Sequence, residues 1–135
     1  NPLMEDIPVT LQVSNKLIDV VDKELENLIA YPYDCLEQTA NKLWALLMLK
    51  EINKAKGKTF PYEKRIAPLL NKLIKNQQTD GGWGWWAGGY TNLHITTRIL
   101  QVLRHVPATD ATKKALREGY LYLQNALPPL ALFCH

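Results

Sequence analysis

The chain has 135 residues, of which 47% are apolar and 21% are charged, and its formal net charge is +3. This balance is typical of one globular domain and excludes a disordered or fibrous chain. The charge is too small and too dispersed to predict nucleic-acid binding. No apolar run approaches the length of a membrane span, and the first residues lack the pattern of a signal peptide. Because the chain starts at Asn1 rather than at a methionine, we expect it to be a piece of a longer protein.

Apolar periodicity predicts five helices that follow a short extended segment. Residues 1–13 contain two prolines and alternate Val9, Leu11 and Val13, which is typical of a strand or linker. The expected helices cover about residues 14–31, 35–56, 62–77, 92–106 and 110–127. Pro68 lies within the third of them, so we expect a kink or a later start there. The predicted fold class is all-α.

The expected helices differ in how their apolar residues are distributed. In the second helix these residues cover most of the circumference, which predicts an inner helix that is buried on more than one side. The apolar residues of the second helix are Leu36, Ala40, Leu43, Trp44, Leu46, Leu47, Met48 and Leu49. The fourth helix is expected to turn Ile95, Ile99, Leu103 and Val106 inward, and the fifth has its apolar stripe at Ala115, Leu116, Tyr120 and Leu123.

Cys35 and Gln38 stand three residues apart where a turn with Pro32 and Asp34 leads into the second helix. Positions i and i+3 share one face of a helix or turn, so the Cys35 sulfur and the Gln38 carboxamide carbon can touch. Such contact is the geometric requirement for a bond between them. The unpaired N–H groups and the positive dipole end of the helix would also favour a thiolate, which is both a nucleophile and a good leaving group. A disulfide between Cys35 and Cys134 is the alternative, although Cys134 lies in a tail that is expected to fray.

Residues 78–91 form a turn-rich loop with five glycines and three tryptophans. Glycines permit left-handed backbone and close approach, and the indole rings of Trp83, Trp85 and Trp86 can pack across helix ends. Two interpretations are open for these tryptophans. They are either structural packing or a shield over Cys35 and Gln38.

These residues resemble the thioester domain of the α2-macroglobulin and complement family, especially its bacterial members. In that family a Cys-Gly-Glu-Gln motif loses ammonia to form an internal thioester between its cysteine and glutamine. Here the motif is Cys35, Leu36, Glu37 and Gln38, with leucine in place of the glycine that would relieve crowding in a tight ring. The resemblance extends to Tyr31, Pro32 and Asn41, with Tyr33 also near the site, and to Asp80, Gly81, Gly82 and Trp83, which match the family's turn of aspartate, glycine and an aromatic residue.

The resemblance implies part of an α/α toroid, a ring of helical hairpins that bury one another's apolar faces. Residues 1–13 would then be a linker or the end of a preceding β domain, and residues 14–135 the N-terminal part of the thioester domain. The chain would supply about half of the ring. We therefore expect it to cover its unpartnered apolar faces by dimerising, by swapping elements or by packing its own tail.

The resemblance also implies a function, that of a covalent protease trap. An amine or hydroxyl of an attacking protease would attack the Gln38 acyl carbon, and Cys35 would depart as a thiolate. The partners would be target proteases and other domains of the parent protein, in an extracytoplasmic location, with no cofactor and no metal. Each molecule would react once, so the chain is not expected to be an enzyme. Glu37 would orient the turn or bond to the ring, or serve only the helix dipole. Neither His94 nor His105 matches the histidine that relays the acyl group in some family members.

Two other functions are open on the sequence. One is an α/α-toroid interaction module in which no thioester is active. The other is a piece of a toroid enzyme such as a terpenoid cyclase or prenyltransferase, which would need acidic or zinc-binding residues facing a cavity. Asp80 is the only acidic residue of the loop 78–91, and no His and Cys have the spacing of zinc ligands. The sequence therefore argues against the enzyme.

Overall fold

The structure, a computed structural model, describes residues 19–20, 23–28, 30 and 35–127. These residues are helical or lie in loops, so the all-α prediction is confirmed for the described part of the chain, which contains no strand. The chain divides into two compact units, Asn1–Pro32 and Tyr33–His135. In the first unit residues 19–20, 23–28 and 30 are helical, as predicted. The expected extended segment 1–13 and the start of the first helix lie outside the described residues.

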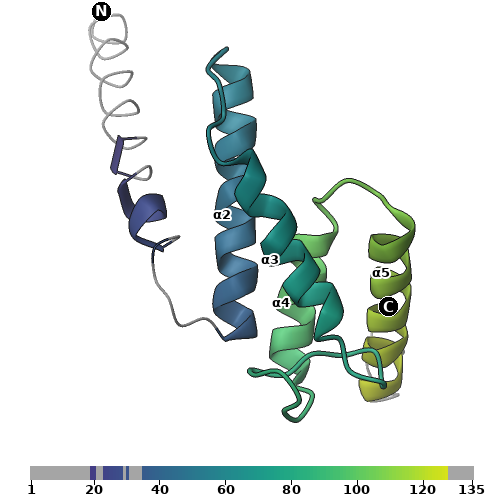
Figure 1. The fold of residues 1–135 in the computed structure, drawn as a ribbon. Helices are drawn as coiled ribbons and strands as arrows, with labels where there is room; N and C mark the ends of the chain where they lie inside the picture. The colour runs from purple at the N-terminus through teal and green to yellow at the C-terminus, as the bar shows by residue number, and fades with distance from the viewer. Residues whose placement is uncertain (1–18, 21–22, 29, 31–34, 128–135) are drawn as a thin grey trace, which may run out of the picture. The chain divides into compact units, whose positions relative to one another are not determined.

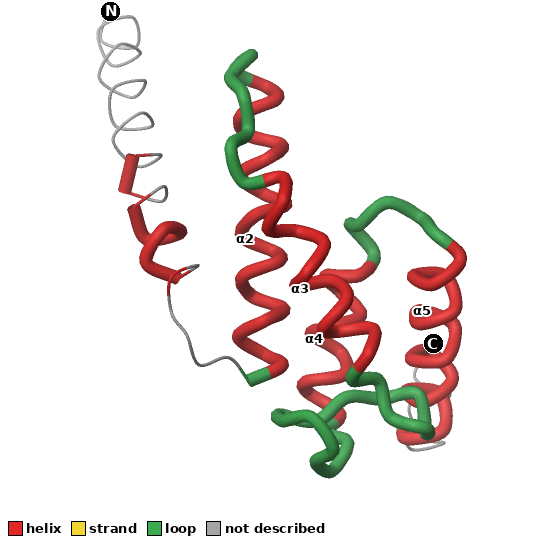
Figure 2. Tube along the Cα trace, in the orientation of Figure 1, coloured by secondary structure: helices red, strands yellow, loops and turns green. Residues whose placement is uncertain are grey.

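The second unit contains helices α2 (Leu36–Ala55), α3 (Glu63–Lys75), α4 (Leu93–Leu103) and α5 (Asp110–Ala126). Consecutive helices run in opposite directions (Figure 1). Helix α2 packs against α3 and α4, and α5 packs mainly against α4. As a result, the start of α2, the end of α3, the start of α4 and the loop that joins α3 to α4 all lie at one end of this unit (Figure 2).

Helix α2 has the predicted bounds, because Cys35 caps its start and Gly57, with φ 68°, follows its C-cap Lys56. It contacts two other helices, and its buried residues include Leu43 and Leu46. The helix is nevertheless less enclosed than predicted. Trp44 and Leu47 are only half-buried, and Met48 is 46% exposed. These three side chains line an open hollow of about 420 Å³ between α2 and the end of α4, together with Lys50, Glu51, Arg104, His105, Val106 and Pro107.

Helices α3 and α4 also match their predicted positions closely. Helix α3 begins at Glu63 and includes Pro68, so the later start considered for this helix is wrong. Helix α4 is capped by Asn92, whose Oδ1 accepts the N–H of Ile95 at 3.0 Å. All the residues predicted to face inward from this segment, Ile95, Ile99, Leu103 and Val106, are buried.

Helix α5 buries only part of the stripe that the sequence predicts, because Ala115 is buried whereas Leu116 and Leu123 are half-buried. Its buried positions are Thr112, Ala115 and Gly119, whereas Tyr120 is 44% exposed and therefore does not belong to the core. Packing is close at this face, because a Cβ atom at position 119 would lie only 2.5 Å from Cδ2 of Leu100 on α4 and that side chain would have to shift. The close approach of α4 thus selects the small face of α5 and leaves larger apolar side chains at the surface. The expectation that the chain covers its unpartnered apolar faces, by dimerising, by swapping elements or by packing its tail, remains a prediction.

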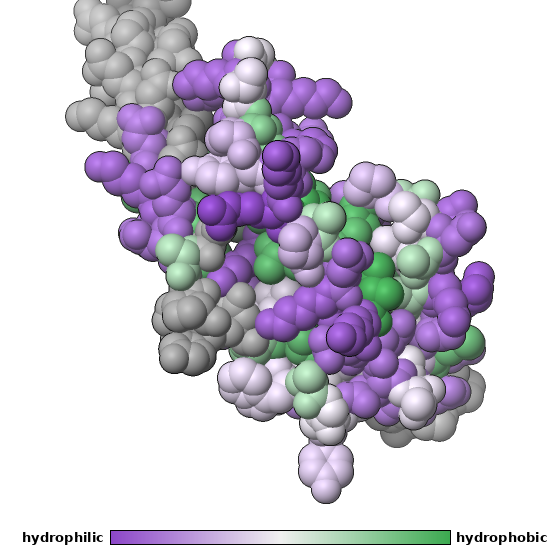
Figure 3. All heavy atoms as spheres, viewed as in Figure 1, coloured by the Kyte–Doolittle hydropathy of each residue, from purple (hydrophilic) through white to green (hydrophobic). Residues whose placement is uncertain are grey.

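The surface of the described residues is mostly hydrophilic on the face that Figure 3 shows, where apolar atoms appear mainly in the seams between helices. Within the described part of the chain, no helix combines the length and the apolarity that a membrane crossing requires.

Gly81 ties the loop after α3 to α5, and we expect Gly81→Ala to lower the free energy of unfolding by about 2–4 kcal/mol. Gly81 has φ 92°, and a Cβ added there would lie 2.2 Å from the backbone oxygen of Glu118 on α5. Gly57→Ala is the matched control, because Gly57 has φ 68° but open space around it. Only backbone strain of about 1 kcal/mol is expected for that control. Urea unfolding of the two variants measures the difference, and equal losses would contradict the close contact.

Candidate functional site

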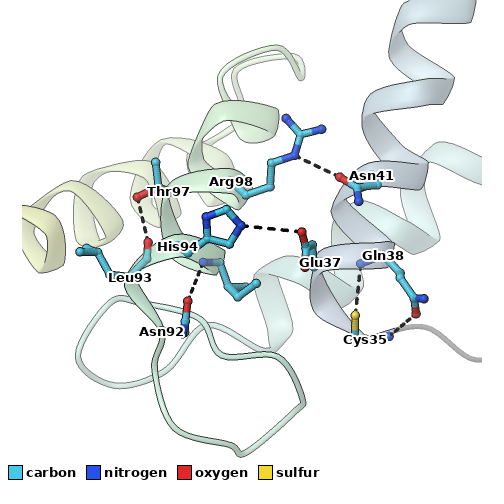
Figure 4. Close-up of polar contacts among 10 residues, drawn as sticks. Cys35, Glu37, Gln38, Asn41, Asn92, Leu93, His94, Thr97 and Arg98 are labelled. Atoms are coloured by element: carbon cyan, nitrogen blue, oxygen red, sulfur yellow. Dashed lines mark hydrogen bonds and ion pairs between the residues drawn. The ribbon is translucent and has the colours of Figure 1, made fainter.

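Cys35 and Gln38 form a reciprocal capping box at the start of α2 (Figure 4). The Gln38 N–H donates to Sγ of Cys35 at 3.4 Å, and the Cys35 N–H donates to Oε1 of Gln38 at 3.0 Å. Each side chain therefore lies against the backbone of the other residue. Cys35 is a free thiol and is buried, with 8% of its surface exposed. The structure thus pairs the two residues through their backbones. The predicted contact between the Cys35 sulfur and the Gln38 carboxamide carbon stays a prediction.

The leucine that replaces the family's glycine fits this geometry without strain. Leu36 is the first residue of α2, is 1% exposed and belongs to the core. Among the described residues, none other than glycine has a positive φ. Position 36 therefore needs no glycine for the backbone of this structure, in which Cys35 is a free thiol, and the side chain adds to the buried face of the helix.

A second segment of the chain reaches the same helix end. The Leu36 N–H donates to the Trp85 carbonyl oxygen at 2.7 Å. This donor is one of the backbone N–H groups that the first turn of a helix cannot pair internally. The loop between α3 and α4 thus completes the cap that Cys35 begins, and it brings a residue distant in sequence against the Cys35–Leu36 peptide.

Trp83 anchors that loop in the core. Its side chain is fully buried, and its Nε1–H donates to the Leu73 carbonyl at 2.7 Å. Its backbone is also fixed, because its N–H donates to Oγ1 of Thr96 at 2.8 Å and its carbonyl accepts the Asn92 N–H at 2.8 Å. For Trp83 the packing interpretation is therefore confirmed.

The other two tryptophans do not pack into the core. Trp85 is 45% exposed and Trp86 is 62% exposed, so the packing interpretation is wrong for them. Tyr90, which the sequence does not single out, is almost fully exposed in the same loop.

The loop bends back on itself at Gly84. This bend is possible because Gly84 has no side chain, since a Cβ there would lie 2.1 Å from the Tyr90 carbonyl oxygen. The predicted turn of Asp80 is present too, with its Oδ1 accepting the Gly82 N–H at 3.0 Å.

Glu37 points away from the Cys35–Gln38 pair, toward α4 (Figure 4). Its Oε1 lies 3.8 Å from Nε2 of His94, whose side chain is 72% exposed. Glu37 therefore occupies the first turn of α2, where a negative charge favours the helix dipole. The described contacts give it no bond to the ring atoms of Cys35 or Gln38.

Asn41 is placed by a contact that sequence reasoning missed. Its Oδ1 accepts the Nε–H of Arg98 from α4 at 3.0 Å, and the Arg98 guanidinium carbon lies 5.8 Å from the Trp44 ring centroid.

Thr39 is a second residue that sequence reasoning missed, although it directly follows the motif. Its Oγ1 donates to the Cys35 carbonyl at 3.0 Å. The signal that could have found Thr39 is the tendency of threonine to bond to the carbonyl four residues earlier in a helix.

This arrangement can support chemistry between a thiol and a carboxamide. The Gln38 N–H stabilises negative charge on the sulfur, and the Cys35 N–H polarises the carboxamide through its oxygen. The neighbouring Tyr31, Pro32 and Tyr33 lie outside the described residues. No cluster of three or more His, Cys, Asp or Glu residues that could hold a metal ion occurs in the part of the chain that the structure describes.

Comparison with known proteins gives one similarity. The chain is 28% identical over 113 residues to a protein from Thermotoga maritima named Alpha-2-macroglobulin. The aligned region is 82% of this chain but only 7% of that protein, so the chain spans a small part of it. No protein-family model matches the chain. No solved structure matches it either. The chain is thus similar in sequence to a small part of a bacterial alpha-2-macroglobulin.

Proposed function

We propose that this chain is part of the thioester domain of an α2-macroglobulin-like protease inhibitor, and that Cys35 and Gln38 form its thioester. The observation that carries the proposal is the reciprocal capping box, in which the thiol and the carboxamide lie against each other's backbone N–H at 3.4 and 3.0 Å. The partial similarity to a protein named Alpha-2-macroglobulin supports the same family. The trap, its protease targets and an extracytoplasmic location belong to this proposal.

Formation of the thioester would proceed within the first turn of α2. The Cys35 sulfur attacks the Gln38 carboxamide carbon, and negative charge develops on Oε1, where the Cys35 N–H already donates a hydrogen bond. The C–N bond then breaks, and the nitrogen leaves as ammonia with the thiol proton. Holding both groups on one helical turn makes the step intramolecular, which removes most of the entropic cost of bringing them together.

In the capture of a protease Cys35 would change from nucleophile to leaving group, while the Gln38 acyl carbon would again be the electrophile. A lysine amine of the protease adds to the Gln38 acyl carbon, an amide forms, and the C–S bond breaks. Cys35 leaves as a thiolate and takes up the proton that the amine loses. One protease is bound per thioester, and no turnover follows. The trap thus consumes its own reactive group.

The test of this function is the intact mass of the freshly purified full-length protein before and after treatment with methylamine. We expect the untreated protein to be lighter than its sequence by one ammonia. Methylamine should then add to Gln38 and release one thiol at Cys35, because an amine cleaves a thioester as described above. An untreated mass equal to that of the sequence, with Cys35 reacting at once with a thiol reagent, would overturn the proposal.

A second function, an interaction module without a thioester, is favoured by the exposed aromatic residues of the loop. Trp85, Trp86 and Tyr90 present large apolar surface on the loop whose Trp85 carbonyl bonds to the start of α2. Exposed aromatic residues are typical of binding surfaces. The same mass measurement separates the two functions, since a module needs no ammonia loss.

A further inference from the structure

The peptide group between Cys35 and Leu36 is held at both of its polar atoms. Its N–H donates to the Trp85 carbonyl at 2.7 Å. Its carbonyl oxygen accepts two hydrogen bonds, from the Thr39 N–H at 2.9 Å and from the Thr39 Oγ1 at 3.0 Å. The peptide plane is therefore fixed from two sides, by α2 itself and by the loop between α3 and α4.

Fixing this plane determines where the Cys35 side chain points. The plane contains the Cα of Cys35, and the Cys35 nitrogen is separately held by Oε1 of Gln38 at 3.0 Å. With the nitrogen and the carbonyl carbon both placed, tetrahedral geometry at Cα leaves one direction for Cβ. Only χ1 then remains to position the sulfur.

The Thr39 hydroxyl has no evident purpose in the stability of α2. Threonine is a weaker helix former than alanine, and bonding of its hydroxyl to the carbonyl four residues earlier does not strengthen a helix. Thr39 is nevertheless fully buried, and its hydroxyl donates a hydrogen bond to the carbonyl oxygen of Cys35.

We propose that Thr39 and the Trp85 carbonyl are positioning groups for closure of the Cys35–Gln38 ring, an inference that rests on the proposed thioester. Neither group touches the reacting atoms. They act through the Cys35–Leu36 peptide, which fixes the direction of the Cys35 Cβ and so limits the positions from which Sγ can reach the Gln38 carboxamide carbon. Loop residues far from the motif thereby control the rate at which the bond forms.

Thr39→Val removes the hydroxyl while keeping the branched shape of the side chain, and we expect it to slow ring closure about ten-fold or more. Thr39→Ser keeps the hydroxyl and should close at nearly the wild-type rate. Thr97→Val on α4 is the matched control, because the Thr97 hydroxyl makes the same kind of bond, to the Leu93 carbonyl at 2.8 Å, away from Cys35. Its rate should be unchanged.

Gly84→Ala tests the loop side of the same proposal. The added Cβ would lie 2.1 Å from the Tyr90 carbonyl oxygen, so the backbone must shift next to Trp85. We expect ring closure to slow about ten-fold or more in this variant as well, because the Leu36 N–H loses its partner.

The measurement uses full-length protein made by cell-free synthesis. After synthesis is stopped, samples are treated with methylamine at intervals, and the labelled Gln38 peptide is quantified by mass spectrometry. Melting temperatures of all variants are measured in parallel, since a merely structural Thr39 would change the melting temperature and not the rate.

A wild-type protein that never takes up methylamine overturns the proposed thioester and this inference together. A reactive wild-type protein with unchanged rates in Thr39→Val and Gly84→Ala, or with Thr39→Ser as slow as Thr39→Val, overturns the positioning role alone.

Discussion

Replacing Cys35 with serine should abolish methylamine incorporation at Gln38 and leave α2 intact. Serine is one of the best N-cap residues, so its hydroxyl can accept the Gln38 N–H that Sγ now accepts at 3.4 Å. A neutral hydroxyl is a much weaker nucleophile and a much poorer leaving group than a thiolate, so no activated acyl group should form. The expected result is a protein with the mass of its sequence and no labelled Gln38.

Cys35→Ala separates the two roles of this cysteine, the cap and the nucleophile. It should also take up no methylamine, but it additionally loses the cap at the start of α2. We expect the free energy of unfolding to fall by about 0.5–2 kcal/mol relative to Cys35→Ser. Intact mass and urea unfolding measure the two effects. Methylamine on Gln38 in either variant would show that the label does not report a thioester.

Trp83→Ala is expected to be the most destabilising single substitution at this end of the second unit. The side chain is fully buried, so its removal leaves a large cavity beneath the loop. Loss of a buried tryptophan costs about 3–5 kcal/mol. For a domain of this size a loss of 1 kcal/mol in the free energy of unfolding lowers the melting temperature by roughly 3–6 °C, so we expect a fall of more than about 10 °C.

Trp83→Phe distinguishes packing from the hydrogen bond. Phenylalanine fills part of the cavity but cannot donate to the Leu73 carbonyl, which the Trp83 Nε1–H now reaches at 2.7 Å. That carbonyl still accepts the Asn76 N–H at 3.2 Å, so no acceptor is left unpaired. We expect the loss to be less than half of that in Trp83→Ala. Calorimetry measures both variants, and equal losses would show that the indole N–H, rather than the volume, holds the loop.

The loop between α3 and α4 links Trp83 in the core to Cys35 at the start of α2. Trp83 holds it in the core, Gly84 allows its bend, and the Trp85 carbonyl reaches the start of α2. A disturbance anywhere along these three residues therefore reaches the Cys35–Leu36 peptide.

The sequence by itself determined the features that depend on neighbours within one or two helical turns. Helix bounds follow from apolar periodicity and from local signals, such as Asn92 at the start of α4 and Gly57 after α2. The approach of Cys35 to Gln38 is equally local, because residues three apart on a first helical turn share a face. For that reason the proximity of the two residues could be predicted from the sequence, whereas the capping box that joins them is a finding of the structure.

Only the tertiary structure decided which face α5 buries. Helix α5 turns Thr112, Ala115 and Gly119 inward, with Gly119 packed closely against Leu100 of α4, and Tyr120 is left exposed. Periodicity ranks residues by their apolar character, whereas packing selects them by their volume against a particular neighbour. The bond from Leu36 to the Trp85 carbonyl is of the same kind. It joins segments that are far apart in the sequence, and it depends on how Trp83 seats the loop, which no local pattern encodes.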